Sequence, residues 1–198
     1  PNYKIWNHVL IKDNQFFDCG YYNQGAGGYG WIAGSGTNGA SNLYKDFKVV
    51  GNTFYDSPFP SFFSEEKNQA AWTSGPWNIT FSNNTLVNFN TRADGSIIKM
   101  RYLPNNSVFN FKNNLFLNET GSATILAKSG TKVPVMKNNW FFNCSSAAFW
   151  GGTISQEAAT ANGGGILETD PCANSAEFNF KLTDASLKAA GVGDPRWK

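Results

Sequence analysis

Charged residues and histidine are scarce in this chain of 198 residues. Asp, Glu, Lys and Arg make up 15 % of it, and the formal net charge of +2 argues against nucleic acid as a partner. A Ser-His-Asp esterase would have to use the single histidine, His8, and no G-x-S-x-G nucleophile motif is present. No apolar run approaches the roughly 18 residues that a membrane-spanning helix needs, so we expect no membrane span in this chain.

Cysteine is also rare, and the spacing of the three cysteines matches no zinc site. Cys144 and Cys172 lie about one repeat apart and could form a disulfide, whereas Cys19 is too distant from Cys144 to do so. Buried free thiols are the alternative. The glycines of segment 20–46 follow no phosphate-binding spacing. We therefore expect neither a metal ion nor a cofactor.

What the sequence does contain is a repeat rich in asparagine and phenylalanine. Five stretches align on one asparagine, and the aligned asparagines are 38, 32, 30 and 25 residues apart, a period typical of solenoid proteins. The stretches are residues 9–18, 47–56, 79–88, 109–118 and 134–143, and the aligned residues are Asn14, Asn52, Asn84, Asn114 and Asn139. We expect one repeat domain over residues 1–198, closed by a tail at residues 166–198.

Each repeat predicts a strand, a corner and a second strand. A large apolar residue stands three positions before each aligned asparagine and another stands two positions after it, as expected for inward-facing strand positions. The residue just before the asparagine is Asp, Gly or Asn, which tolerate a left-handed backbone. Stacked amides can bond to one another along the interior. The pattern predicts an all-β fold, a single-stranded, right-handed parallel β-helix with an internal asparagine ladder. An antiparallel sandwich of hairpins is the alternative, but it leaves the fixed register unexplained.

A second apolar column should face outward, directly after the inward residue of the second strand. It consists of Phe17, Tyr55, Val87, Leu117 and Phe142. Exposed together, these side chains would form a larger apolar patch than monomers usually present to solvent. We expect a loop or the C-terminal tail to cover them. The alternative is a protein interface, either with a missing N-terminal domain or with an outer-membrane transport complex.

The tail contains Thr169-Asp170-Pro171, the run FNFKL at residues 178–182, Ser186 and Gly191-Val192-Gly193. With the five repeats, these segments resemble a pectin-lyase-like β-helix domain of unknown function. That domain occurs at the C-terminus of lipoproteins encoded in Bacteroidetes polysaccharide-utilisation loci. The resemblance covers most of the chain and implies an exported protein of glycan uptake, at the cell surface, in the periplasm or outside the cell. The start at Pro1, just before a repeat, suggests the C-terminal part of a longer protein. Activity does not follow, because β-helices carry many functions.

Third strands of the coils are expected at residues 96–101, 123–128 and 147–150. Strand alternation places Lys99, Arg101 and Lys128 outward, with Arg101 and Lys128 as stacked neighbours. In pectin-lyase-like families the corresponding sheet carries the active-site cleft, so the resemblance implies a basic groove here. The candidate aromatic residues for this groove are Tyr102, Trp72, Trp77 and Trp31.

Such a groove would bind an acidic, plant or host polysaccharide, and carbohydrate binding without catalysis is the function we expect. One alternative is a metal-independent polysaccharide lyase. In it, Lys99 would be the base, with its pKa lowered by Arg101 and Lys128, and Arg101 would stabilise the enolate-like intermediate. Another is a non-catalytic scaffold or accessory subunit of a glycan-uptake complex, and basic residues that merely keep the protein soluble are a third. Calcium-dependent lyases and paired-aspartate hydrolases are disfavoured, because the outer sheet lacks a carboxylate cluster and a close aspartate pair.

Overall fold

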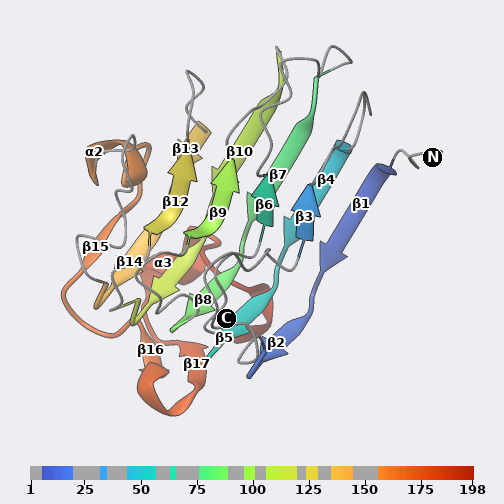
Figure 1. Ribbon diagram of the computed structural model, residues 1–198. Helices are drawn as coiled ribbons and strands as arrows, with labels where there is room; N and C mark the ends of the chain where they lie inside the picture. Colours follow the sequence, from blue (N-terminus) through green and yellow to red (C-terminus); the bar gives the residue numbers. More distant parts are fainter. Residues whose placement is uncertain are drawn as a thin grey trace.

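The computed structural model describes residues 6–19, 32–34, 44–56, 63–65, 76–88, 96–100, 106–119, 124–128, 135–144 and 156–198. In the strands at residues 32–34, 63–65, 96–100 and 124–128 it describes the backbone alone. Strands dominate the regular structure, and the helices are short (Figure 1). In this part of the chain no helix is long and apolar enough to span a membrane.

Three parallel sheets organise the described strands, and the chain visits them in rotation. The first sheet has the order β1 (Trp6–Lys12), β4 (Tyr44–Val50), β7 (Asn78–Ser82), β10 (Val108–Lys112) and β13 (Val135–Lys137). The second has β2 (Gln15–Phe17), β5 (Thr53–Tyr55), β8 (Thr85–Val87), β11 (Leu115–Leu117), β14 (Trp140–Phe142) and β15 (Gly165–Leu167). The third has β3 (Ile32–Gly34), β6 (Phe63–Glu65), β9 (Ser96–Met100) and β12 (Thr124–Lys128).

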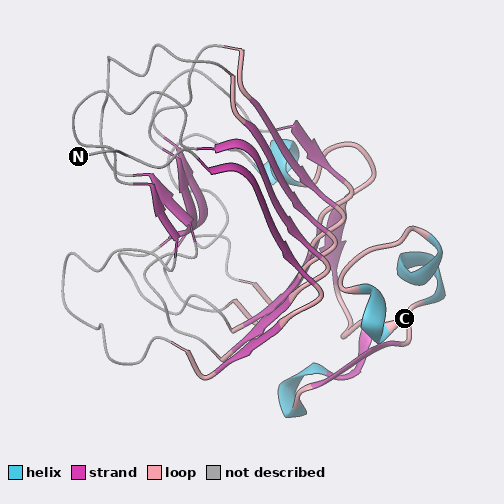
Figure 2. Ribbon diagram, turned by 90° about the vertical axis from the view of Figure 1, so that its right-hand side faces the viewer, coloured by secondary structure: helices cyan, strands magenta, loops and turns pink. Residues whose placement is uncertain are grey.

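Every strand pairing within these three sheets is parallel, as the repeat predicted. Figure 2 shows the first and second sheets meeting at a sharp corner, with the third sheet across from that corner. Successive repeats therefore stack strand on strand. The antiparallel sandwich of hairpins is wrong.

The corner between the first two sheets has a left-handed residue in every repeat. Asp13, Gly51, Asn83, Asn113 and Asn138, which precede the aligned asparagines, have φ angles between 52° and 67°. Aspartate and asparagine tolerate this conformation better than most residues, and glycine adopts it without steric cost. The same chain direction is therefore imposed at each corner, which keeps successive strands in one register.

The aligned asparagines form the predicted ladder. Along the series from Asn14 to Asn139, each Nδ2 donates to the Oδ1 of the next asparagine, at 3.1, 3.1, 3.1 and 3.0 Å. Each backbone N–H donates to that same Oδ1. The second Nδ2 proton of an internal asparagine goes to a carbonyl of the preceding repeat, as from Asn84 to Val49 at 3.0 Å. The four asparagines after Asn14 are fully buried, and these bonds satisfy their amides.

A stack of phenylalanine rings fills the space between the sheets. Phe16 stacks on Phe54 with ring centroids 4.8 Å apart, Phe81 on Phe111 at 5.2 Å, and Phe116 on Phe141 at 5.0 Å. Parallel pairing at the register of the ladder brings the same side chain of each repeat over its neighbour. The inward residues of the repeat therefore form the core that the sequence pattern predicted.

The C-terminal tail covers the outer face of the second sheet. It contains an antiparallel pair, β16 (Cys172–Asn174) and β17 (Asn179–Leu182), with η1 (Ser175–Glu177), α3 (Ala185–Ala189) and η2 (Pro195–Trp197). Phe180, Leu182, Leu187 and Val192 of the tail form one buried cluster with the outward residues Val87, Leu115 and Leu117 of the second sheet. The expectation that the tail covers the outward apolar column is confirmed, except at Phe17, which is 49 % exposed.

The three cysteines are free thiols. Cys172 is buried in the cluster beneath the tail, and burial raises the pKa of its thiol to about 12. Burial also raises the pKa of Cys144, with a further contribution from the negative charge of Glu119. Cys144 and Cys172 therefore stay protonated at neutral pH and act as small apolar groups. Because both are free, the disulfide considered between them is not formed.

Helix α3 of the tail begins at Asp184, whose Oδ1 accepts hydrogen bonds from the backbone N–H groups of Ser186 at 2.8 Å and Leu187 at 3.0 Å. Replacing Asp184 by alanine is expected to lower the free energy of unfolding by about 1 kcal/mol at pH 7. The hydroxyl of Ser186 and the N–H of Leu187 lower the pKa of Asp184. The contribution is therefore present above the unfolded pKa of about 3.9 and is lost as the pH falls through the lower folded value. Urea unfolding of both proteins at pH 7 and pH 3 tests this; an unchanged difference at pH 3 would contradict it.

Candidate functional site

The predicted basic groove lies on the third sheet, where the backbone register differs from our expectation. Lys99 of β9 pairs with Ala127 of β12, and Lys128 pairs with Met100. Arg101 is therefore not the register partner of Lys128, and the expected alignment was wrong by one residue. The two lysine positions lie on adjacent strands but in successive register rows, which alternate between the two faces of a sheet, so the backbone does not bring them together on one face. Arg101, Tyr102, Trp72 and Trp31 lie outside the described residues.

Trp77 does not belong to such a groove. The residue stands just before β7, and its side chain is 1 % exposed within the hydrophobic core. Its backbone is anchored on the next repeat, because Ser107 Oγ accepts from the Trp77 N–H at 2.9 Å and Val108 N–H donates to the Trp77 carbonyl at 2.8 Å. A sugar in solvent cannot reach this ring, and the assignment of Trp77 to carbohydrate binding was wrong.

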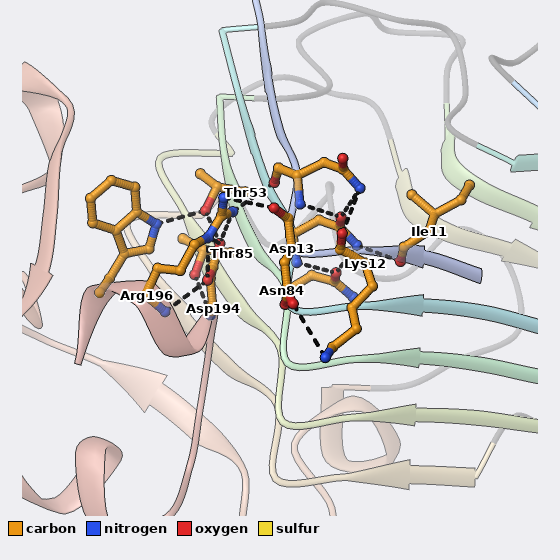
Figure 3. A network of polar contacts seen from close by, with 11 residues as sticks. Ile11, Lys12, Asp13, Thr53, Asn84, Thr85, Asp194 and Arg196 are labelled. Carbon is orange, nitrogen blue, oxygen red and sulfur yellow. Dashed lines mark hydrogen bonds and ion pairs between the residues drawn. The ribbon is translucent and has the colours of Figure 1, made fainter.

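A buried polar network joins the end of the tail to the corner of the first repeats (Figure 3). Asp194 is completely buried, and its Oδ2 accepts from Thr53 Oγ1 at 2.6 Å. Arg196 binds both carboxylate oxygens of Asp194 and donates to the carbonyls of Asp13 and Asn14. The hydrogen bond with Asp194 raises the pKa of the Arg196 guanidinium. This network holds the tail against the repeats. Its polar groups form hydrogen bonds with one another, so the network serves the structure of the protein.

The outer face of the first sheet carries a small charge cluster. Asp46 Oδ2 lies 3.0 Å from Lys48 Nζ and 3.5 Å from His8 Nδ1, and the hydrogen bond from Lys48 is the largest cause that lowers the pKa of Asp46. The same register row continues with Asn78 and Val108. Neither is a nucleophile, so the His8–Asp46 pair has no catalytic partner within its described row.

Two exposed lysines stand side by side at another edge of this face. Lys112 of β10 and Lys137 of β13 are register partners on adjacent strands. Lys12 occupies the same row at the other end of the sheet, where it forms an ion pair with Asp13 at 3.2 Å. The backbones of the adjacent strands β10 and β13 are about 5 Å apart, and Val50 and Ser82 separate the pair from Lys12 in the row.

The tail and the first two repeats together expose a group of aromatic rings. We call Phe17, Tyr55 and Phe178 the aromatic patch. Phe17 stacks on Tyr55 with centroids 4.6 Å apart, and the Phe178 ring lies 5.3 Å from Tyr55 and 6.1 Å from Phe17. Phe17 and Phe178 are 49 % and 46 % exposed, whereas most other rings of the tail and repeats are buried. About half of each of these two side chains is therefore accessible from solvent.

Phe178 has an unusual backbone for a bulky residue. Its φ angle of 61° lies in the left-handed region, at the end of η1. A side chain with a Cβ is strained there, and such strain concentrates at functional positions. The next strand, β17, is anchored by the buried Phe180, so the turn at Phe178 directs this ring toward Tyr55 and Phe17.

Polar side chains adjoin the aromatic patch in sequence and in the stack. Asp18 and Asp56 directly follow Phe17 and Tyr55, at the second left-handed corner of the repeat. Asn88 continues this column, and its Nδ2 donates to Asp56 Oδ1 at 3.3 Å. Aromatic faces beside carboxylate and amide groups can recognise a ligand that is apolar on one face and rich in hydroxyl groups at its edge.

The repeat alignment already contained Phe17 and Tyr55 as members of the outward column, but it predicted that they would be covered. Phe178 appeared in the sequence only as part of the tail motif. Nothing in the spacing of Phe17 and Phe178, which lie far apart in the chain, indicated that their rings would meet. The Asp194–Arg196 network was missed for the same reason, although an Asp-Pro-Arg-Trp segment after two glycines indicates a capped turn.

Comparison with known proteins identifies a family. Residues 79–197 match the model of a family described as "Domain of unknown function (DUF5123)". No curated protein and no solved structure matches the chain significantly. The matched span contains Asn84, Asn114 and Asn139 of the ladder and the tail up to Trp197, including Asp194 and Arg196. Because it covers more than half of the chain, the protein belongs to this DUF5123 family of domains of unknown function.

Proposed function

We propose that the domain is a single-stranded, right-handed parallel β-helix that binds carbohydrate on its surface and performs no chemistry on it. Three parallel sheets visited in rotation support the coil, and right-handed crossovers are the rule between parallel strands. We further propose that the domain belongs to an exported bacterial lipoprotein that takes part in polysaccharide utilisation. The resemblance of the repeats and the tail to such proteins supports this.

The aromatic patch is the observation that carries the binding proposal. Its two exposed rings, Phe17 and Phe178, are held by separate parts of the chain on a rigid stack of strands. The C–H bonds of a pyranose ring carry partial positive charge, and they are attracted to the negative face of an aromatic ring. Asp18 and Asp56 stand at the adjoining corner, where their carboxylates can accept hydrogen bonds from sugar hydroxyls.

The basic positions favour an acidic glycan. Lys112 and Lys137 are exposed register partners on adjacent strands of the first sheet, whereas Lys99 and Lys128 of the third sheet fall in different register rows. Uronate or sulfate groups repeat along a polysaccharide, and the neighbouring ammonium groups of Lys112 and Lys137 can contact such groups. We retain Arg101, Lys128, Tyr102, Trp72 and Trp31 as proposed carbohydrate contacts.

Replacing Phe178 by glycine is expected to weaken polysaccharide binding about tenfold while leaving the fold intact, because one stacking ring is lost. Glycine accepts the φ of 61° without strain, which offsets part of the packing that the Phe178 ring loses against Tyr55 and Phe17. Phe178→Tyr keeps the ring and should retain binding. Leu10→Ala, which removes an exposed apolar side chain of the first sheet, is the matched control.

Affinity electrophoresis against alginate, pectate, glycosaminoglycans and neutral plant glycans measures these effects, with Lys99→Ala and Arg101→Ala run beside them. If Phe178→Gly and Leu10→Ala reduced the retardation of the protein by a polysaccharide equally, this result would contradict the role of the aromatic patch. If no polysaccharide retards the wild-type protein, the alternative of a non-catalytic scaffold in a glycan-uptake complex is favoured.

The alternative of a polysaccharide lyase is tested on the same substrates. A β-elimination on a uronate produces an unsaturated sugar that absorbs in the ultraviolet, with Lys99 as the proposed base and Arg101 as the stabiliser of the enolate-like intermediate. Absorbance that rises with the wild type and not with Lys99→Ala would establish the lyase. A flat trace on every uronate removes it and leaves the binding proposal.

A further inference from the structure

The N-terminal end of the strand stack presents an unfilled hydrogen-bonding position. Asn52, Asn84, Asn114 and Asn139 each accept two hydrogen bonds at Oδ1, from the backbone N–H and the Nδ2 of the asparagine before them. Asn14 donates in the same way but accepts nothing at its own Oδ1 among the described residues, and its side chain is exposed. The repeated geometry directs this oxygen outward from the end of the stack.

The other groups at this end are open in the same direction. β1 and β2 are the edge strands of the first and second sheets in the described part of the chain, and Figure 1 shows β1 at one side of the stack. The inward side chains Val9 and Ile11 of β1 are only partly buried, whereas Phe47 and Val49 in the next strand are 2 % and 1 % exposed. One more layer of strands would complete their burial.

The opposite end of the stack is closed by the chain itself. α2 (Gln156–Ala159) and the turn after it lie beside β13 and β14, and the Nδ2 of Asn162 donates to the carbonyl of Met136 at 2.8 Å. A further ladder asparagine would donate to this same carbonyl. Gly164 occupies the ladder position, and a Cβ there would lie 2.3 Å from the carbonyl oxygen of Asn139. Within the described residues, the position that a further ladder asparagine would take at this end is already filled by Asn162 and Gly164.

We propose that the N-terminal end of the stack is a docking site for one more coil of the same kind. The occupant is a polypeptide segment outside residues 6–198, with one strand parallel to β1, a second parallel to β2, and an asparagine at the corner between them. Its backbone N–H and Nδ2 donate to Asn14 Oδ1, and its second Nδ2 proton is free for its own repeat, as that of Asn14 bonds Lys12 O.

The direction of the ladder selects this occupant over a second copy of the chain. Two copies that meet through their N-terminal ends would bring two Asn14 Oδ1 acceptors together with no donor between them, which is unfavourable when buried. A head-to-tail pair would need an open C-terminal end, and the residues from α2 to Gly164 close it. Only a segment with free donors and parallel strands matches the site.

The test adds such a coil to the full chain. A duplicate of residues 106–133, one complete repeat that contains its own ladder asparagine, is fused in front of Pro1. Hydrogen exchange of the β1 amides, followed by mass spectrometry, is expected to slow by about tenfold. The matched control is the same fusion with Asn114→Asp in the duplicate, because a carboxylate has no proton to donate to Asn14 Oδ1. Its β1 exchange should equal that of the unfused chain.

Equal β1 exchange in the two fusions would overturn the proposal, whether both are slow or both match the unfused chain.

A second variant tests Asn14 Oδ1 as the acceptor. When Asn14→Leu is introduced into the asparagine fusion, its β1 amides should exchange as fast as those of the unfused Asn14→Leu chain. Sedimentation of the unfused chain at micromolar concentration measures whether the chain is a monomer or a dimer. A dimer there, abolished by substitutions in β1, would assign the site to a second copy and contradict the proposed occupant.

Discussion

Replacing Asn84 by leucine is expected to lower the free energy of unfolding by about 3–5 kcal/mol, the larger of the effects that this fold predicts. Leucine has nearly the shape of asparagine but lacks the side-chain oxygen. In the native protein Asn84 Oδ1 accepts from the N–H and the Nδ2 of Asn52 at 3.0 and 3.1 Å, and both donors lose this acceptor. The carbonyl of Val49 and the Oδ1 of Asn114 lose a donor as well. Each of these groups is buried, so water cannot replace the lost partner.

Guanidinium unfolding of the purified variant measures the loss, and Asn14→Leu is the matched control. Asn14 makes the same donor contacts to Asn52, but it is exposed and supports no preceding asparagine. Its replacement should cost about 1 kcal/mol. If Asn84→Leu and Asn14→Leu destabilised the protein equally, the ladder would not be the source of the stability.

Replacing Asp194 by alanine is expected to cost about 3 kcal/mol and to loosen the tail. The substitution removes the acceptor for Thr53 Oγ1 and leaves the Arg196 guanidinium without its carboxylate. Because the Arg196 side chain is 31 % exposed, water screens part of its charge, and the loss stays below that of a fully buried pair. The tail should open first, since these contacts join it to the repeats.

Chemical unfolding gives the total loss, and limited proteolysis followed by mass spectrometry locates it in residues 166–198. Asp184→Ala serves as the comparison, because that carboxylate also belongs to the tail but caps only α3. The double variant Asp194→Ala, Arg196→Ala should be less destabilised than the sum of the single variants, since each removes the same contact. Additive losses would show that the two side chains are not coupled.

The parallel stacking could be predicted because its causes are local and repeated. Asn83, Asn113 and Asn138 carry the left-handed corner, and the asparagine that follows each of them has a neighbour of its own kind one repeat away. When the same residue type recurs at one position of a repeat, each copy lies against the next, so the sequence alone predicts the neighbours of that residue. The inward phenylalanines follow from the same alignment.

The candidate sites could be predicted less well, because they depend on segments of unequal length. The distance from each corner to its third strand varies between repeats, and the expected pairing of Arg101 with Lys128 failed where Met100 takes that place. Trp77 stands just before β7, and periodicity did not indicate that its ring turns into the core. The aromatic patch requires Phe178 to meet Phe17 across the whole length of the chain.

The amino-acid sequence by itself determined the stack, since the backbone preference of Asx residues and the hydrogen-bonding capacity of the asparagine amide act within one repeat and its neighbour. Only the tertiary structure decided which outward side chains stay in solvent. The tail buries Val87 and Leu117 but leaves Phe17 exposed, and it brings Asp194 to Thr53 from 141 residues away. Contacts of this kind depend on where a non-repeating segment lies, and no periodicity encodes that position.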